Sequence, residues 1–175
     1  MKTTQEYLLS VFDYNQETGL LKYRQRPMHH FKTKSACSNW NNNKAGKVLT
    51  YVGNHGYIEV AIDYKKYLAH RIIWFIEHGY WPNEIDHLNG IKTDNRAINI
   101  IDTDRKTNCK NLPLRKNNKL NVTGIRLRKY GYEVYISDNG KLLSLGNTKD
   151  FFEAVCLRKS AERKLGYSLH HGRLQ

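Results

Sequence analysis

The chain has 175 residues, of which 39% are hydrophobic and 11% aromatic, a composition that excludes an intrinsically disordered protein. Lys and Arg number 29 against 16 Asp and Glu, giving a net charge of +13. Residues 1–114 hold 16 basic and 11 acidic side chains and residues 115–175 hold 13 and 5, so the excess is not confined to one tail. A distributed basic excess is typical of proteins that bind nucleic acid.

The cysteines Cys37, Cys109 and Cys156 are widely spaced and form no CxxC pair. This pattern predicts reduced thiols in an intracellular protein, and neither a disulfide framework nor a cysteine-built zinc site. No signal peptide or membrane span is predicted, so we expect a cytoplasmic protein without membrane contact.

The first elements predicted along the chain are a short helix over residues 2–12 and a short strand over 20–23, separated by a turn. Residues 25–47 are polar and nearly aperiodic, which predicts a long loop or a flexible arm. Basic side chains in and around this segment fit an arm or a small sheet that follows the DNA backbone, and a solvated loop is a comparable interpretation. These side chains are Lys22, Arg24, Arg26, Lys32, Lys34, Lys44 and Lys47.

Alternation predicts a β-hairpin, with residues 57–62 and 67–70 as its strands and residues 63–66 as its turn. Residues 71–78 have the apolar spacing of a helix, which Gly79 is placed to end and Pro82 prevents from resuming.

A basic, Asn-rich segment over 112–120 has the composition of a linker. The pattern of apolar residues changes after it. Three short strands are predicted over 123–128, 132–137 and 142–145, and Asn139-Gly140 indicates a tight hairpin turn between the last two. A helix is predicted over 150–164, capped by Thr148 or Asp150.

Residues 85–111 carry the residues with the strongest chemical signal. Most Asn side chains here are expected in turns, with Asn89-Gly90 as a clear example. Asp86-His87 differs, because it places a hard oxygen ligand for a metal beside an imidazole that can take a proton near neutral pH. Either residue alone would be read as a cap or as an ordinary histidine.

With His70-Arg71 upstream and the Asn residues downstream, residues 67–111 resemble the HNH nucleases, in particular those of phages and mobile introns. The resemblance implies a ββα-metal fold of two antiparallel strands and a helix around one divalent ion. The final motif residue here is Asn, which corresponds to the H-N-N variant and to an oxygen ligand suited to Mg²⁺ or Mn²⁺.

Carried over by position, the resemblance implies that His87 is the general base and that Asp86 and Asn108 are metal ligands. Asn111 competes with Asn108 for the second ligand position. Asn99 would brace the loop that orients His87. His70 would be catalytic through a phosphate contact or would be structural, and Arg71 would bind DNA.

Residues 121–167 resemble the three-stranded DNA-binding domain of plant Apetala-type and ethylene-response factors, which also occurs fused to phage HNH nucleases. The segments that carry this resemblance are Thr123–Arg128, Tyr132–Ile136, Leu143–Gly146 and Phe152–Val155. Side chains two apart share a face of a strand, so Arg126 and Arg128 are expected on one DNA-binding face. Tyr135 or Tyr132 would share that face, with Lys141 at the hairpin end. The Trp residues of plant members are replaced by Tyr132 and Leu143.

The sequence thus predicts an α+β chain with a ββα-metal nuclease domain over 1–112, a linker over 113–120 and a three-stranded sheet with a helix over 121–175. The predicted activity is metal-dependent, site-specific cleavage of double-stranded DNA by a homing-type enzyme, monomeric or weakly dimeric. Two alternatives are a non-catalytic DNA-binding regulator on the same scaffold and a protein that binds or cleaves RNA. The intact Asp86-His87 disfavours the first, and a sheet suited to the wide major groove of DNA disfavours the second.

Overall fold

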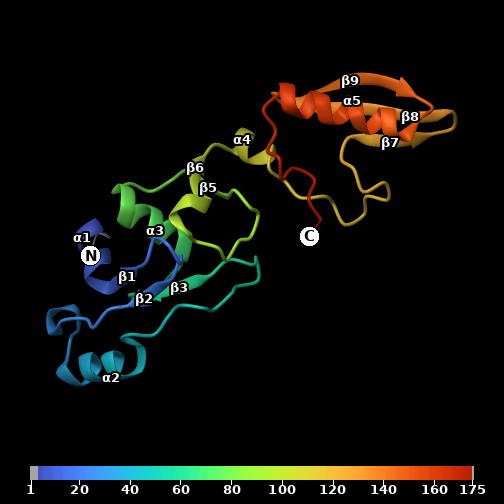
Figure 1. Ribbon diagram of the computed structural model, residues 1–175. Helices are drawn as coiled ribbons and strands as arrows, with labels where there is room; N and C mark the ends of the chain where they lie inside the picture. The colour runs from blue at the N-terminus through green and yellow to red at the C-terminus, as the bar shows by residue number, and fades with distance from the viewer. Residues whose placement is uncertain (1–3, 175) are drawn as a thin grey trace. The chain divides into compact units, whose positions relative to one another are not determined.

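The computed structural model describes residues 4–174, which mix helices with small antiparallel sheets (Figure 1). The chain divides into two compact units, Met1–Thr103 and Asp104–Gln175. The boundary therefore lies before the segment 113–120 that the composition indicated as a linker. This segment joins the second unit because the neighbouring backbone is paired with the C-terminal tail: Leu114 N donates to Arg173 O at 2.8 Å and Gly172 N to Leu112 O at 2.9 Å.

In the described part of the first unit, the strands pair as two-stranded antiparallel sheets. Their bounds are β1 (Phe12–Tyr14) with β2 (Leu21–Tyr23), β3 (Glu59–Ile62) with β4 (Lys65–Leu68), and β5 (Glu84–His87) with β6 (Ile100–Thr103). The helices α1 (Gln5–Val11) and α3 (Ala69–His78) supply much of the core. The helix predicted over 2–12 is observed from Gln5, capped by Thr4, and residues 2 and 3 lie outside the described residues.

Helix α3 confirms the prediction made from apolar spacing. Its buried apolar side chains include Ile72, Ile73, Phe75 and Ile76. Gly79 ends the helix with φ 78°, a left-handed conformation that glycine adopts without the steric cost of a Cβ.

The prediction of a loop or flexible arm over 25–47 is wrong for most of its length. A short 3₁₀ helix η1 (Met28–His30) is followed by α2 (Lys34–Lys44), which Thr33 caps. No residue of α2 is fully buried, so the apolar periodicity that reveals a packed helix is missing. Trp40 instead anchors α2 edge-on to the Tyr23 ring, with the ring centroids 5.1 Å apart.

The second unit contains α4 (Arg105–Cys109), a sheet in the order β7 (Ile125–Arg128), β8 (Gly131–Asp138), β9 (Lys141–Thr148), and α5 (Phe151–Lys164). The predicted turn is confirmed, because Asn139 and Gly140 have φ of 51° and 77°. Asp150 caps α5 by accepting from Glu153 N at 2.7 Å, and Val134 and Ala154 meet in the core.

A charged pair is buried in this small unit. Arg158 and Glu162 lie one turn apart on α5 with side chains only 4% and 6% exposed, and Arg158 Nε donates to Glu162 Oε1 at 2.9 Å. Arg158 Nη1 also donates to Tyr135 O at 2.7 Å, so one guanidinium joins α5 to β8.

Candidate active site

Asp86 and His87 end the strand β5, which pairs with β6 in the register Asp86 to Ile101 and His87 to Ile100. Burial alternates along β5: Ile85 and His87 are buried, while Asp86 is half-buried. Neighbouring residues of a strand point to opposite faces. The carboxylate therefore leaves the strand on the more exposed side and the imidazole on the core side.

Asn95 is the side chain that holds the His87 ring. His87 Nε2 lies 3.1 Å from Asn95 Oδ1, with both residues buried. An amide oxygen can only accept a hydrogen bond, so Nε2 carries the proton and Nδ1 carries the basic lone pair. Burial lowers the pKa of His87, opposed by the Asn95 hydrogen bond and by the charge of Asp86. The ring is therefore neutral near pH 7, the form that can accept a proton.

Asn99 braces the loop between β5 and β6. Its Oδ1 accepts from Asn89 N at 3.0 Å and its Nδ2 donates to Asp94 O at 2.7 Å, so one amide ties both ends of the loop. These two bonds of Asn99 go to backbone groups, and Asn95 makes the direct contact to His87. Adjacent Asn and Asp residues are so common in turns that the sequence did not distinguish Asn95 from them.

The N-terminal segment supports this loop from outside the motif. Tyr14 Oη donates to Asn95 O at 2.9 Å, and Ala97 N donates to Gln16 O at 3.1 Å. Gly19 has φ 72°, and a Cβ there would lie 2.5 Å from Arg96 N. A side chain at position 19 would therefore push against the backbone that positions Asn95.

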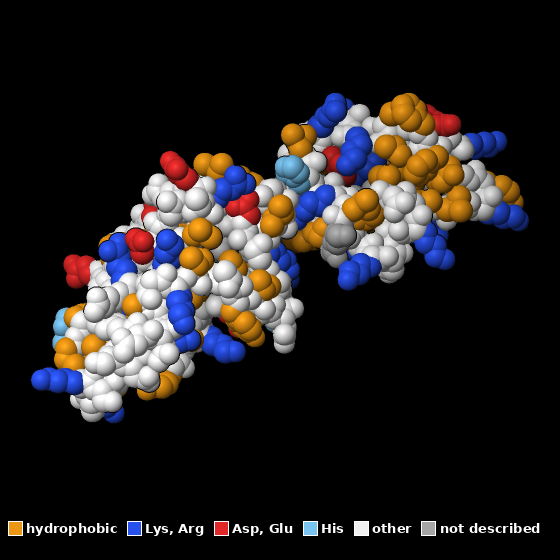
Figure 2. Space-filling view, turned by 60° about the horizontal axis from the view of Figure 1, so that its bottom comes forward, with side chains coloured by type: hydrophobic (Ala, Val, Ile, Leu, Met, Phe, Trp, Pro, Cys, Tyr) orange, Lys and Arg blue, Asp and Glu red, His pale blue; other side chains and the backbone are white. Residues whose placement is uncertain are grey.

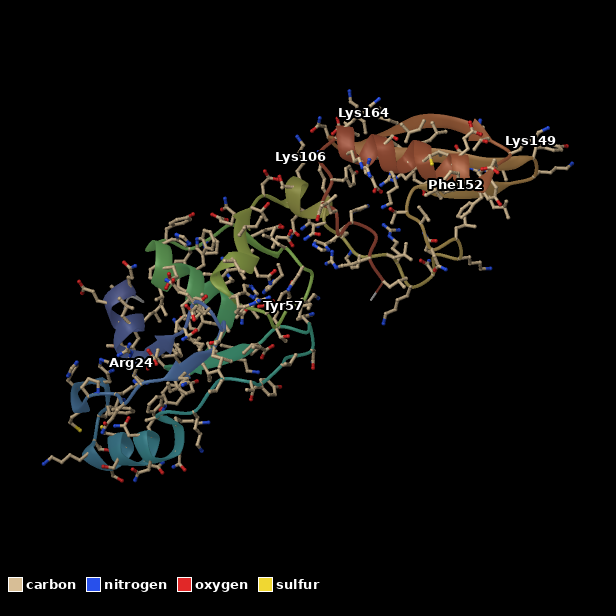
Figure 3. All side chains as sticks on the ribbon, in the orientation of Figure 1. Arg24, Tyr57, Lys106, Lys149, Phe152 and Lys164 are labelled. Carbon is tan, nitrogen blue, oxygen red and sulfur yellow. The ribbon has the colours of Figure 1, made fainter. Side chains whose placement is uncertain are left out.

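Tyr57, labelled in Figure 3, is a site residue that the sequence did not indicate, because it precedes the motif. Its ring centroid lies 4.8 Å from that of His70 and 5.8 Å from that of His87, and the two histidine rings meet edge-on at 5.1 Å. Burial, followed by the charge of Asp86, raises the pKa of Tyr57. Tyr57 thus lies beside both histidine rings of the site.

His70 is buried in this cluster and its Nδ1 has no hydrogen-bond partner among the described residues. Burial, followed by the charges of His87 and Arg71, lowers its pKa to about 3.

The lowered pKa of His70 makes the free energy of unfolding depend on pH. An unfolded histidine titrates near 6.5, so below that pH the unfolded chain takes up a proton while folded His70 stays neutral, and stability falls. We expect the wild type to lose about 2 kcal/mol more than His70→Phe between pH 7 and pH 5, measured by urea unfolding. Equal losses in both proteins would contradict this account of His70.

Arg71 lies in the first unit and Asn108 in the second, and their expected roles stay predictions. Arg71 Nη2 donates to Pro82 O at 2.6 Å and Nη1 to Asn83 O at 3.3 Å, so this guanidinium ties α3 to the segment before β5. Asn108 lies on α4, and the competing Asn111 follows α4 in the same second unit. The expected order of strand, strand and helix is present as β5, β6 and α4.

HNH nucleases typically use a divalent metal. Among residues 4–174, no group of three or more His, Cys, Asp and Glu side chains is placed to bind a metal ion. Mg²⁺ does not need such a group, because it keeps several waters and binds through one or two carboxylates and phosphate oxygens. The half-buried carboxylate of Asp86 and an amide oxygen fit that requirement, whereas a zinc site would need more nitrogen or sulfur ligands.

The residues expected to bind DNA lie on two different faces of the sheet in the second unit. Arg126 and Tyr135 share the face away from α5, with the guanidinium carbon 4.2 Å from the ring centroid. Arg128 is on the same face and pairs with Glu133 at 2.6 Å. Tyr132 lies on the other face, 5.2 Å from the Phe151 ring, so Tyr135 is the tyrosine that shares the arginine face. Lys141 is exposed at the start of β9.

Helices that could cross a membrane are absent from residues 4–174. Neither a curated protein nor a solved structure matches the chain. The Apetala-type resemblance of the C-terminal block stays a prediction. Residues 67–108, which include His70, Asp86, His87 and Asn99, match the family model described as HNH endonuclease, and this match supports an HNH nuclease with a nucleic-acid substrate.

Proposed function

We propose that the chain is a DNA endonuclease that hydrolyses phosphodiester bonds with His87 as its general base. The observation that carries the proposal is the buried His87–Asn95 hydrogen bond inside the region that matches the HNH endonuclease model. We further infer site-specific cutting by a homing-type enzyme of a phage or mobile element, acting in the cytoplasm of the host cell.

In this proposal, His87 Nδ1 takes a proton from a water molecule that attacks the phosphorus in line. Asn95 keeps the proton on Nε2, and so keeps the lone pair on Nδ1 before each turnover. Asn99 holds the surrounding loop, and Gly19 and Tyr14 support it from the N-terminal segment. His70 and Tyr57 pack around the base and limit its contact with bulk water.

One divalent cation, Mg²⁺ or Mn²⁺, would be held by Asp86 and Asn108. When bound, it would stabilise the negative charge that develops on the phosphate and on the leaving oxygen. The proposal requires this ligand and the base, which are consecutive residues of β5, to act on the same phosphate.

The second unit would hold double-stranded DNA through the face that carries Arg126 and Tyr135, with Lys141 at its edge. Arginine is suited to guanine edges and to phosphates because it can donate two parallel hydrogen bonds. Glu133 neutralises Arg128, so we assign Arg126 the larger part in binding.

Supercoiled plasmid that carries the natural target tests the activity. We expect nicked or linear DNA when Mg²⁺ or Mn²⁺ is present, because the proposed ligands are oxygens, and intact plasmid when EDTA is present. Gel electrophoresis separates the three forms. DNA that stays supercoiled with either metal while the protein binds it would instead favour the non-catalytic regulator.

A further inference from the structure

The second unit contains a groove of about 990 Å³ that the Asp86-His87 site does not include. One side is the sheet face away from α5, with Tyr135 and Leu142. The other sides come from α4, from the segment after it and from the C-terminal tail. Lys106, labelled in Figure 3, projects from α4.

The wall of this groove is ordered. Lys110 O accepts from Ser168 N at 3.1 Å, and Asn111 O accepts from Arg173 Nη1 at 2.6 Å. Together with the Leu114–Arg173 and Leu112–Gly172 bonds, these contacts hold residues 110–114 against the tail. A segment whose composition indicates a linker is therefore a built part of the second unit.

The lining of the groove is strongly basic. It includes the cations Arg105, Lys106, Lys110, Arg115, Arg126 and Arg158, and no Asp or Glu. Glu162 neutralises Arg158, and Asp138 lies 3.9 Å from Lys110. The exposed cations of the lining are Arg105, Lys106, Arg115 and Arg126. The whole unit, residues 104–175, holds 16 basic and 6 acidic side chains, a net charge of +10, and Figure 2 shows many more Lys and Arg than Asp and Glu side chains on the visible face.

Apolar and aromatic surface lies between these cations. Leu112 is 49% exposed and Leu142 is 61% exposed, and the Tyr135 ring lies under Arg126. Separated cations over an apolar floor suit a sugar-phosphate backbone, in which charged phosphates alternate with sugars.

We propose that this groove binds the sugar-phosphate backbone of double-stranded DNA, with Arg115 and Lys106 as phosphate contacts. Residues 104–115 are then part of the DNA-binding surface and extend it beyond the sheet face. The proposal rests on the proposed function only in taking DNA as the ligand, and it does not depend on cleavage.

The test is the salt dependence of binding to a short, fluorescent, mixed-sequence duplex, measured by anisotropy in EDTA so that no metal-dependent cutting occurs. Each lost phosphate contact reduces the slope of log K against log salt concentration by about 0.9. We expect that loss for Arg115→Ala and about twice that loss for Arg115→Ala/Lys106→Ala. Lys116→Ala and Lys119→Ala are matched controls, because both residues are exposed in the same segment and neither lines the groove.

The controls should keep the wild-type slope. A wild-type slope for Arg115→Ala would contradict DNA binding by the groove. An equal reduction of the slope for Lys116→Ala would contradict it too, because it would show only a general effect of charge. Failure of the wild type to bind duplex DNA would instead overturn the proposed function itself. The two failures are thus distinguishable in one titration series.

Discussion

His87→Ala is expected to reduce DNA cleavage by roughly 10²–10⁴-fold, the usual contribution of general acid–base catalysis. The substitution removes the only group assigned to take the proton from the attacking water. His87→Gln should be equally inactive, because its amide can donate towards Asn95 Oδ1 but has no basic nitrogen. Cleavage of labelled plasmid, with enzyme in excess over DNA, measures the effect.

Two controls distinguish a loss of catalysis from a loss of folding. His29→Ala changes an exposed histidine of the same unit and should cut at the wild-type rate. Duplex binding by His87→Ala, measured by anisotropy, should stay within a few-fold of wild type because the DNA contacts are assigned to the second unit. Loss of binding together with cutting would indicate a folding defect and would refute the assigned role.

Arg158→Ala is expected to lower the free energy of unfolding of the second unit by about 3–5 kcal/mol, the usual effect of removing one partner of a buried ion pair. The Glu162 carboxylate, 6% exposed, would keep Lys159 but lose its buried guanidinium partner, and Tyr135 O would lose its hydrogen bond. Arg163→Ala, an exposed change on the same helix, should alter stability by no more than about 0.5 kcal/mol.

The tryptophans make this experiment selective, because Trp40, Trp74 and Trp81 all lie in the first unit. Tryptophan fluorescence should therefore be nearly unchanged while amide hydrogen exchange in β8 becomes faster. Arg158→Met/Glu162→Leu should recover most of the lost stability, since apolar replacement of a buried pair is often neutral. Unchanged exchange in β8 for Arg158→Ala would contradict the structural role of the pair.

The parts of the fold that sequence could predict have local causes. Asn139-Gly140 and Gly79 tolerate positive φ, and Asp150 caps the helix that follows it, so each marks its turn or helix end without tertiary information. The spacing of Ile72, Ile73, Phe75 and Ile76 likewise identifies the buried side of α3.

The parts that sequence could not predict depend on contacts between distant residues. Helix α2 is anchored by Trp40 and has no apolar stripe, so its sequence is that of a polar loop. Arg158 and Glu162 have the spacing of an exposed ion pair, and only the tertiary fold buries them.

The candidate site likewise has residues that the sequence could identify and contacts that only the folded structure shows. Asp86, His87 and Asn99 could be identified from a motif because their order along the chain is distinctive. The contacts of Asn95 with His87, and of Tyr57 with His70, require the folded loop and the segment before β3. Asn108 as a metal ligand stays a prediction.

Chemical rescue of His87→Ala by imidazole tests the central claim most directly, because it supplies the missing base without the side chain. Rates should be measured on supercoiled plasmid with Mg²⁺ over increasing imidazole concentration at fixed pH. We predict that the rate of His87→Ala rises with imidazole and that the rate of the wild type does not. A variant that cuts at the wild-type rate without imidazole, or that stays inactive at every concentration while still binding DNA, would contradict His87 as the general base.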